Sequence, residues 1–168
     1  TRRSSDLLTV IVGKAKGIDK EAEAAGIVQE QEAQAKAAVI AEEVHNIMAP
    51  VSGEVISVEE IGDGVFSGKA LGDGVGIFPD DGVIVAPCAA RVTTLIEDSR
   101  HAVGLVLGNG MELLIHVGVD TVEMNGDGFE DFVKEGDKVK KGQKIMKFDR
   151  EKIKKAGHPD TVVLLLTN

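Results

Sequence analysis

Short runs of Val, Ile and Leu, separated by Gly, Asp and Pro, make up most of the chain from Ile47 onward. Turn-forming residues recur at intervals of roughly ten residues, which is typical of an all-β sandwich or barrel. The pattern predicts strands at residues 53–58, 74–78, 83–85, 91–96, 103–107, 111–117, 144–148 and 161–166. It also predicts a short helix at residues 129–134 and a turn at residues 150–156. The expected main region of the fold is therefore residues 47–168.

The N-terminal part of the chain has a different pattern. Residues 7–12 (LLTVIV) have the composition of a strand, which Gly13 would end. Residues 29–44 are rich in Gln, Ala and Glu, which favour a helix, but their apolar face is weak. Such a segment is typical of an exposed connection, so residues 29–46 are predicted to be a helical linker.

Two further patterns are typical of sandwich folds. An Ala-Pro turn feeds a predicted strand twice, at Ala49-Pro50 and at Ala86-Pro87. Residues 135–145 place Gly-Asp and Lys-Gly pairs next to alternating residues and predict a hairpin-like element. Barrel-sandwich folds of biotinyl and lipoyl carriers present a modifiable lysine at a hairpin tip. Lys147 instead falls inside a predicted strand and is expected to be an ordinary solvent-facing residue.

Composition narrows the class of protein. The 168 residues suffice for one domain with a buried core, which Val, Ile, Leu and Ala must build because there are 5 Phe and no Trp or Tyr. The net charge of −9 argues against nucleic acid and anionic membrane surfaces as partners and favours a basic protein.

The cysteine count and the absence of long apolar stretches bear on localisation. The single cysteine, Cys88, rules out an intramolecular disulfide and fits a reducing cytosol. It is expected to be a small buried hydrophobic residue rather than a nucleophile. No stretch is long and apolar enough to span a membrane, and no signal peptide is evident, so a cytoplasmic domain is expected.

His116 is the strongest candidate for chemistry. It lies at the end of an apolar run without proline and is followed by Gly118, which leaves room for an approaching group. A neutral imidazole in such a place can carry a phosphoryl group, a metal or a proton. The alternative is a hydrogen-bonded core histidine with no chemical role. A second histidine, His101, in the segment Ser99-Arg100-His101 argues against that alternative.

Five segments occur in the order seen in one known family: residues 47–54 (IMAPVSGE), 62–66 (GDGVF), 71–75 (LGDGV), 99–102 (SRHA) and 112–122 (ELLIHVGVDTV). From about residue 47 to residue 168 the chain resembles the glucose-type enzyme IIA of the bacterial sugar phosphotransferase system. The resemblance implies an antiparallel β-sandwich with short helices. It also implies a phosphocarrier that accepts a phosphoryl group from the protein HPr and passes it to a cysteine on the IIB domain of a sugar permease. The membrane would be reached only through that permease.

The resemblance assigns roles to three residues of the expected catalytic site. His116 matches the phosphorylated histidine, and burial would keep its ring neutral and nucleophilic. His101 matches a second histidine that donates a hydrogen bond to the transferred phosphoryl group. Ser99 stands where the family carries a threonine whose hydroxyl orients that second ring. The transfer needs no metal and no cofactor.

The resemblance also implies a surface for binding the partners. Around the histidines it places an apolar patch that excludes water, with acidic residues on its rim that pair with basic residues of HPr and the permease domain. The apolar positions are Phe66, Leu71, Ile96 and Leu114, and the acidic positions are Asp63 and Asp120. Simple turn chemistry is the alternative role for Asp63.

The chain departs from the family at both ends. Family members continue beyond the position of Asn168 with further strands, whereas this chain has an additional N-terminal segment of strand, Gly turn and short apolar end. This arrangement predicts a circular permutation, in which residues 1–28 supply the family's C-terminal strands and residues 29–46 form the new connection. The alternative is a truncated domain behind an unrelated N-terminal tail.

Two other functions fit part of the pattern. A phosphorylation-dependent regulatory binding domain would use the same histidine as a switch. Zinc metallopeptidases of related architecture use His-x-x-x-Asp, which His116 and Asp120 reproduce, but they also need His-x-His, which this chain lacks.

Overall fold

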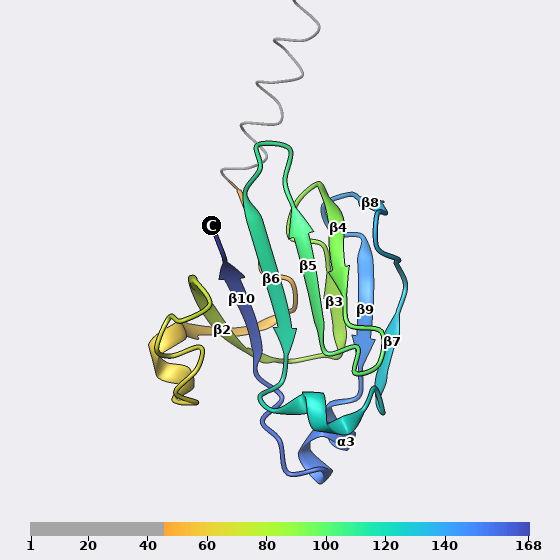
Figure 1. Cartoon of the computed structure of the whole chain (residues 1–168). Coiled ribbons are helices and arrows are strands. Elements are labelled where there is room, and N and C mark those ends of the chain that lie inside the picture. Colours follow the sequence, from red (N-terminus) through yellow and green to blue (C-terminus); the bar gives the residue numbers. More distant parts are fainter. Residues whose placement is uncertain (1–45) are drawn as a thin grey trace, which may run out of the picture. The chain divides into compact units, whose positions relative to one another are not determined.

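Two β-sheets face each other across one apolar core in the computed structural model, which describes residues 46–168 (Figure 1). The larger sheet has the order β1 (Gly53–Ser57), β2 (Asp73–Pro79), β10 (Val162–Leu166), β6 (Glu112–Val117), β5 (Ala102–Val106), β4 (Ala90–Leu95) and β8 (Lys138–Val139). The smaller sheet has the order β3 (Val83–Val85), β9 (Lys144–Phe148) and β7 (Phe129–Asp131). Neighbouring strands pair antiparallel throughout these residues. The predicted antiparallel β-sandwich is confirmed.

Side chains of successive residues in the central strands point alternately to the two faces of the larger sheet. In β6, Leu113, Ile115 and Val117 are buried in the core between the sheets. The intervening residues, among them Leu114 and His116, therefore point to the opposite, outer face. Aliphatic residues of β3 and β9 close the core from the smaller sheet, including Ile84 and Ile145. The sheet thus buries one face completely and presents His116 on the other.

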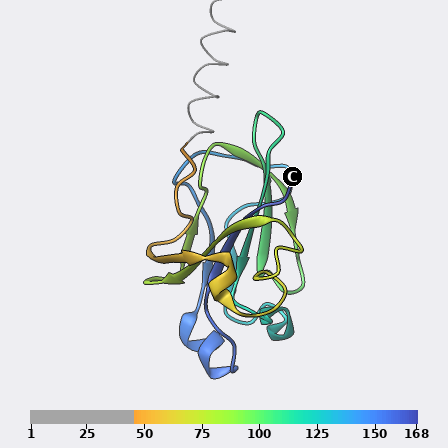
Figure 2. The ribbon, with the colours of Figure 1, turned by 90° about the vertical axis from the view of Figure 1, so that its left-hand side faces the viewer.

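A second, smaller cluster covers part of that outer face. Val163 and Leu165 of β10 pack there with Val58 and Phe66. Val58 begins the 3₁₀ helix η1 (Val58–Ile61), which a Ser57 capping box starts. Figure 2 shows β1, η1 and the loop that follows (orange to yellow) on the side of the molecule nearest the viewer. This excursion between β1 and β2 builds a wall beside the outer face of β10 and β6.

The two Ala-Pro turns lie side by side. The backbone N–H of Met48 donates to the carbonyl of Pro87 at 3.1 Å, and that of Val85 donates to the carbonyl of Pro50 at 2.8 Å. The turn-and-strand repeat seen in the sequence therefore joins two neighbouring parts of the fold.

The predicted helix at residues 129–134 is wrong. Its first half is strand β7, in which Phe129 is the register partner of Phe148, and both rings are buried in the main core. Pairing with β9 satisfies the backbone of this short segment and buries an aromatic ring, which outweighs any local preference for a helix. The predicted turn at residues 150–156 is instead the helix α3 (Arg150–Lys155), whose N-cap Asp149 accepts a hydrogen bond from the N–H of Lys152.

The hairpin-like element predicted at residues 135–145 is also wrong. Its two strands pair with different partners, since β8 joins β4 and β9 joins β3 and β7. Val139 and Ile145 both enter the core, so the chain crosses from one sheet to the other between them. Lys147 is exposed, as predicted for a solvent-facing strand residue.

The predicted strands in residues 1–28 and most of the predicted linker at residues 29–46 lie outside the described residues, so the circular permutation stays a prediction. Asn168 is exposed, and its side chain is hydrogen-bonded to the N–H of Glu112 and the carbonyl of Gly110. Within residues 46–168, no helix is long and apolar enough to cross a membrane.

Candidate functional site

His116 is held on the outer face of the larger sheet by its two neighbouring strands. Its register partners are Ala102 of β5 and Val163 of β10. Gly118 then turns the chain with φ +79°, and a Cβ built there would lie 2.2 Å from Cγ2 of Thr121. Only glycine fits this turn without displacing its neighbours. The turn brings the carbonyl oxygen of Gly118 to 2.8 Å from Nδ1 of His116.

This contact fixes the tautomer of His116. A carbonyl oxygen can only accept a hydrogen bond, so Nδ1 must carry the hydrogen. In the neutral ring the other nitrogen, Nε2, then has a free lone pair. The nitrogen of His116 that could act as a nucleophile is therefore Nε2.

The surroundings of His116 keep its ring neutral. Burial and the neighbouring His101 lower the pKa of His116 to about 4, although the Gly118 carbonyl and the carboxylates of Asp120 and Asp63 act in the opposite direction. Burial also lowers the pKa of His101. Both rings are uncharged near neutral pH, and a neutral imidazole is the nucleophilic form.

His101 lies beside His116, and Ser99, the third residue that the resemblance assigned to the site, lies beside His101. The ring centroids of the two histidines are 4.6 Å apart, at an interplanar angle of 74°. Ser99 Oγ is 2.7 Å from Nδ1 of His101, and both side chains are buried. If the hydroxyl donates, Nδ1 accepts and Nε2 of His101 carries a hydrogen. The pair can thus present one fixed donor next to His116.

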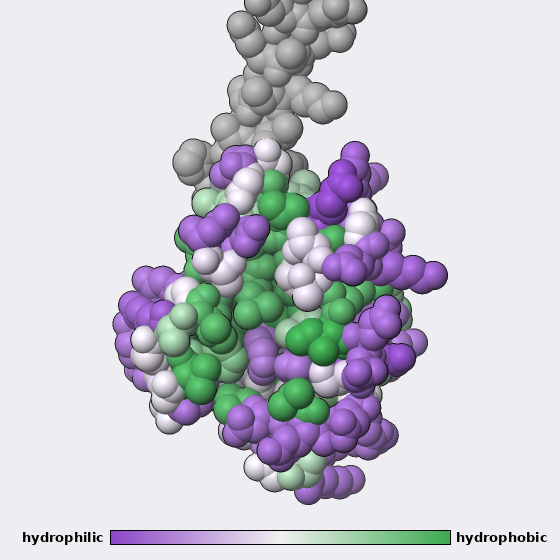
Figure 3. Space-filling model, in the orientation of Figure 1, coloured by the Kyte–Doolittle hydropathy of each residue, from purple (hydrophilic) through white to green (hydrophobic). Residues whose placement is uncertain are grey.

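Phe66 is buried beside the His116 ring and is not part of the exposed surface of the site. It is only 5% exposed and meets the His116 ring edge-on, with ring centroids 4.8 Å apart. Leu114 is half-buried against the same cluster. Leu71 and Ile96 are 46% and 38% exposed. Figure 3 shows apolar side chains gathered over β10, β6 and β5, with hydrophilic side chains around them. The outer face of the sheet is an apolar surface with a polar margin.

Asp63 and Asp120, the two acidic residues expected on the rim of the site, differ in their surroundings. Asp63 is half-buried, and its carboxylate accepts hydrogen bonds from the N–H groups of Phe66 at 3.1 Å and Ser67 at 3.0 Å. Burial raises the pKa of Asp63, but these bonds outweigh it, so the pKa is lowered overall. Asp63 therefore holds the turn that presents Phe66. Asp120 is exposed and adopts a left-handed conformation, φ +58°, two residues after Gly118. Its carboxylate is available at the margin of the site.

Residues 45–168 match the model of a protein family described as the phosphoenolpyruvate-dependent sugar phosphotransferase system, EIIA 1. The chain belongs to this EIIA family. All the residues assigned to the site lie within the matched part.

Relatives of this EIIA domain occur both alone and within longer proteins. The glucose-specific EIIA component of Bacillus cereus is 43% identical over 122 residues, 73% of each chain. The glucose-specific EIICBA component of Staphylococcus saprophyticus is 50% identical over 124 residues, which cover 73% of this chain but only 18% of that protein. Among solved structures, the glucose permease IIA of Mycoplasma capricolum is 34% identical, with a TM-score of 0.68 over 73% of this chain and 79% of that one.

The EIIA site contains features that the sequence did not reveal. Ala102 and Val163 flank His116 only because β5 and β10 pair with β6, and Thr121 supports the turn at Gly118 through a hydrogen bond from its hydroxyl to the carbonyl of Val117. Strand order is a long-range property, so a single run of residues carries no signal for it. Among residues 46–168, no group of three or more His, Cys, Asp and Glu side chains could hold a metal ion.

Proposed function

We propose that this EIIA domain is a phosphocarrier that receives a phosphoryl group on Nε2 of His116 from phosphorylated HPr. It then passes the group to a cysteine on the IIB domain of a sugar permease. The observation that carries the proposal is the hydrogen bond from Nδ1 of His116 to the Gly118 carbonyl, which leaves Nε2 as the nucleophilic atom. Relatives named EIICBA and EIIBCA components support a permease partner, because their EIIA parts are fused to EIIB and EIIC parts.

In the first step, the lone pair on Nε2 of His116 forms the new N–P bond while the N–P bond of the donor phosphohistidine breaks. The bonding electrons of the broken bond return to the donor ring. Phosphorylation makes the His116 ring electron-poor, and the Gly118 carbonyl at Nδ1 stabilises the positive charge that develops there. No metal is needed for this exchange between two ring nitrogens.

His101 stabilises the phosphoryl group mainly while it is passed on from His116. Its ring faces His116 with centroids 4.6 Å apart, so a hydrogen on Nε2 of His101 can reach a phosphoryl oxygen. The Ser99 hydroxyl holds that tautomer by donating to Nδ1. A fixed donor aimed at the charge of a transition state typically contributes a factor on the order of 10²–10³ in rate.

In the second step, a cysteine thiolate of the IIB domain attacks phosphorus. The S–P bond forms, and the bond to Nε2 of His116 breaks. Nε2 recovers the electron pair of the broken bond, and because Nδ1 still carries its hydrogen the ring leaves in its neutral form, so the exit step needs no proton at Nε2. The same environment therefore serves both uptake and release.

The surface around the site fits protein partners. The exposed apolar side chains of Leu71 and Ile96 would exclude water where a partner docks on them. Asp120 on the margin, together with the net charge of −9, attracts basic residues on partners such as HPr and accelerates encounter more than it adds affinity. The permease, not this domain, would determine which sugar is carried.

A reconstituted relay tests the proposal. The protein is incubated with enzyme I, HPr and labelled phosphoenolpyruvate, and then with a IIB domain. We expect one acid-labile, base-stable phosphoryl group on the domain, followed by loss of that label to IIB. Labelling without onward transfer to any IIB domain would favour the regulatory alternative. Omission of HPr is the matched control and should prevent labelling.

A further inference from the structure

The loop between β4 and β5 contains a residue with strained backbone, Arg100, directly between Ser99 and His101. Residues 96–101 carry Ile96 of the partner surface and both Ser99 and His101. Between the last two lies Arg100, with φ +51°. Left-handed backbone is disfavoured for residues with a Cβ and persists only where the surroundings hold it. A change in the backbone angles of Arg100 would move Ser99 relative to His101, since Arg100 is the residue between them.

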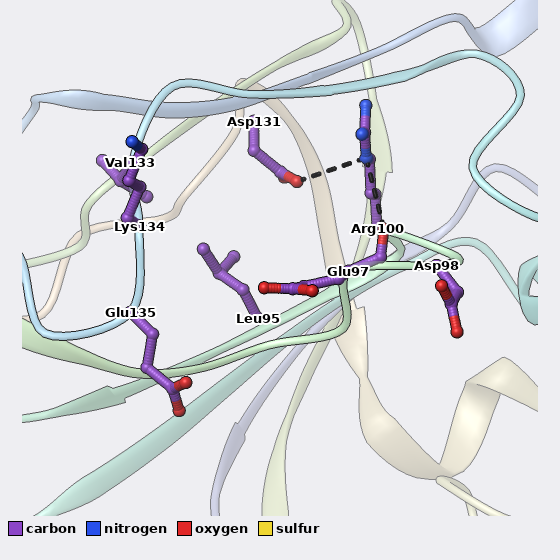
Figure 4. A pocket seen from close by; sticks show the side chains of 8 residues that line it. All are labelled: Leu95, Glu97, Asp98, Arg100, Asp131, Val133, Lys134 and Glu135. Atoms are coloured by element: carbon purple, nitrogen blue, oxygen red, sulfur yellow. Dashed lines mark hydrogen bonds and ion pairs between the residues drawn. The ribbon is translucent and has the colours of Figure 1, made fainter.

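Three contacts hold Arg100. Its backbone N–H donates to the carbonyl of Ile96 at 2.7 Å, and its side-chain Nε lies 3.4 Å from the carbonyl of Glu97. The same Nε lies 3.8 Å from Oδ2 of Asp131, which points toward it in Figure 4. Asp131 ends β7, so this ion pair connects the smaller sheet to a loop of the larger one. The ion pair joins residues far apart in the sequence, whereas the other two contacts are with residues of the same loop.

Burial of the Asp131 carboxyl group costs free energy, which suggests that the residue has a role. Its side chain is 18% exposed, and Oδ1 is buried with no hydrogen-bond partner in the part of the chain described here. Buried polar atoms without a partner are rare in folded proteins. Burial raises the pKa of Asp131, and the Arg100 guanidinium opposes that change. Arg100 is therefore what favours the charged form of this carboxyl group.

The loop is closely packed on one side and faces an open pocket on the other. Gly126 has φ +81°, and a Cβ built on it would lie 2.8 Å from the carbonyl oxygen of Asp98 and 3.8 Å from Cδ of Arg100. The backbone after η2 (Thr121–Met124) thus packs directly against the loop. On the other side, Asp131, Leu95 and Val133 are among the residues that line an open pocket of about 670 Å³ next to Arg100 (Figure 4).

We infer that Asp131 is a positioning residue that acts through Arg100. Their ion pair holds residues 96–101 in the conformation in which the Ser99 hydroxyl orients the His101 ring. This inference rests on the proposed function, because a displaced His101 matters only if that ring assists phosphoryl transfer. Through Arg100, Asp131 sets the angle at which His101 meets the phosphoryl group.

The test uses the full chain and compares Asp131→Asn, Arg100→Gly and the double variant. Asparagine keeps the shape of Asp131 but removes its charge. Glycine accepts φ +51° freely but removes the guanidinium. Asp127→Asn is the matched control, since Asp127 forms an exposed ion pair with Lys152. The first readout is the ring ¹⁵N spectrum and titration of His101 in the unphosphorylated protein. The second is the rate of transfer from the phosphorylated domain to IIB.

We expect both single variants to shift the His101 ring signals and to slow onward transfer about tenfold, less than loss of the donor itself. The double variant should be no worse than either single variant, because both remove one interaction. The Asp127→Asn control should match the wild type. Unchanged His101 signals in Asp131→Asn, or full retention of transfer in Arg100→Gly, would overturn the inference. The ring spectrum needs no phosphorylation, so it remains decisive even if His116 proves not to be a phosphoryl acceptor.

Discussion

Nδ1 of His116 donates its hydrogen to the carbonyl oxygen of Gly118, and the two atoms are 2.8 Å apart. This one bond selects the nitrogen that can react, orients the ring on the outer face of the sheet and depends on a turn that only glycine accommodates. The chemistry of the site is thus tied to a backbone feature two residues away.

Burial of His116 should make stability depend on pH in a defined direction. The folded pKa is about 4, below the value of 6.5 expected in the unfolded chain, so the unfolded state binds more protons between these values. The free energy of unfolding should therefore fall as pH drops from about 6.5 toward about 4, by at most about 3 kcal/mol from this residue. Denaturant unfolding of the wild type and His116→Gln across this range measures the difference. Equal pH slopes for the two proteins would contradict the burial argument.

Gly118→Ala should destabilise the fold and misplace the His116 ring. Alanine must adopt φ +79°, and its Cβ would lie 2.2 Å from Cγ2 of Thr121. We expect a loss of about 2 kcal/mol or more in the free energy of unfolding. Gly136→Ala is the control, because that glycine has φ +90° but no heavy atom within 4 Å of the added Cβ. If the two variants lose equal stability, close packing at Gly118 has no special cost.

Ser99 and His101 should affect release more than uptake. His101→Gln should still become phosphorylated, but it should pass the group on roughly 10²–10³ times more slowly, because the donor is lost. Ser99→Ala should show a smaller loss of the same kind, since Nδ1 of His101 would lose its partner at 2.7 Å. Single-turnover rates of labelling and of transfer to IIB separate the two steps. Equal slowing of both steps in His101→Gln would argue against this division of roles.

The predicted circular permutation can be tested by deletion. If residues 1–28 supply strands to the sandwich, a protein lacking them should unfold or aggregate because a sheet edge is left unpaired. Replacement of residues 29–44 by a flexible linker of equal length should leave the thermal midpoint nearly unchanged. A shortened chain that remains monomeric and melts like the full protein would instead support an unrelated N-terminal tail.

The sequence predicted local elements well where residue pattern alone decides them. β3 and β9 were predicted with their observed bounds, since Val, Ile and Phe are bracketed there by Gly, Asp and Pro. The helix expected at residues 129–134 failed because Phe129 gains its burial from Phe148, a residue far along the chain. The hairpin at residues 135–145 failed for the same reason: which strand pairs with which depends on the whole sheet.

The site shows the same division between local and long-range information. His116, His101 and Ser99 could be singled out from their motifs, and the structure brings the three together. Phe66 was expected on the surface but is buried as a wall of the site. The contact of Arg100 with Asp131 joins the two sheets and could not be read from either segment alone.

The most direct test of the account locates the phosphoryl group on the ring. The domain, labelled with ¹⁵N in its histidines, is phosphorylated through enzyme I and HPr, and the ring nitrogens are observed by ¹⁵N and ³¹P NMR. We expect a single phosphohistidine, His116, with phosphorus bonded to Nε2 and hydrogen still on Nδ1, and no labelling of His116→Gln. Phosphorus on Nδ1 of His116, or on His101, would contradict it.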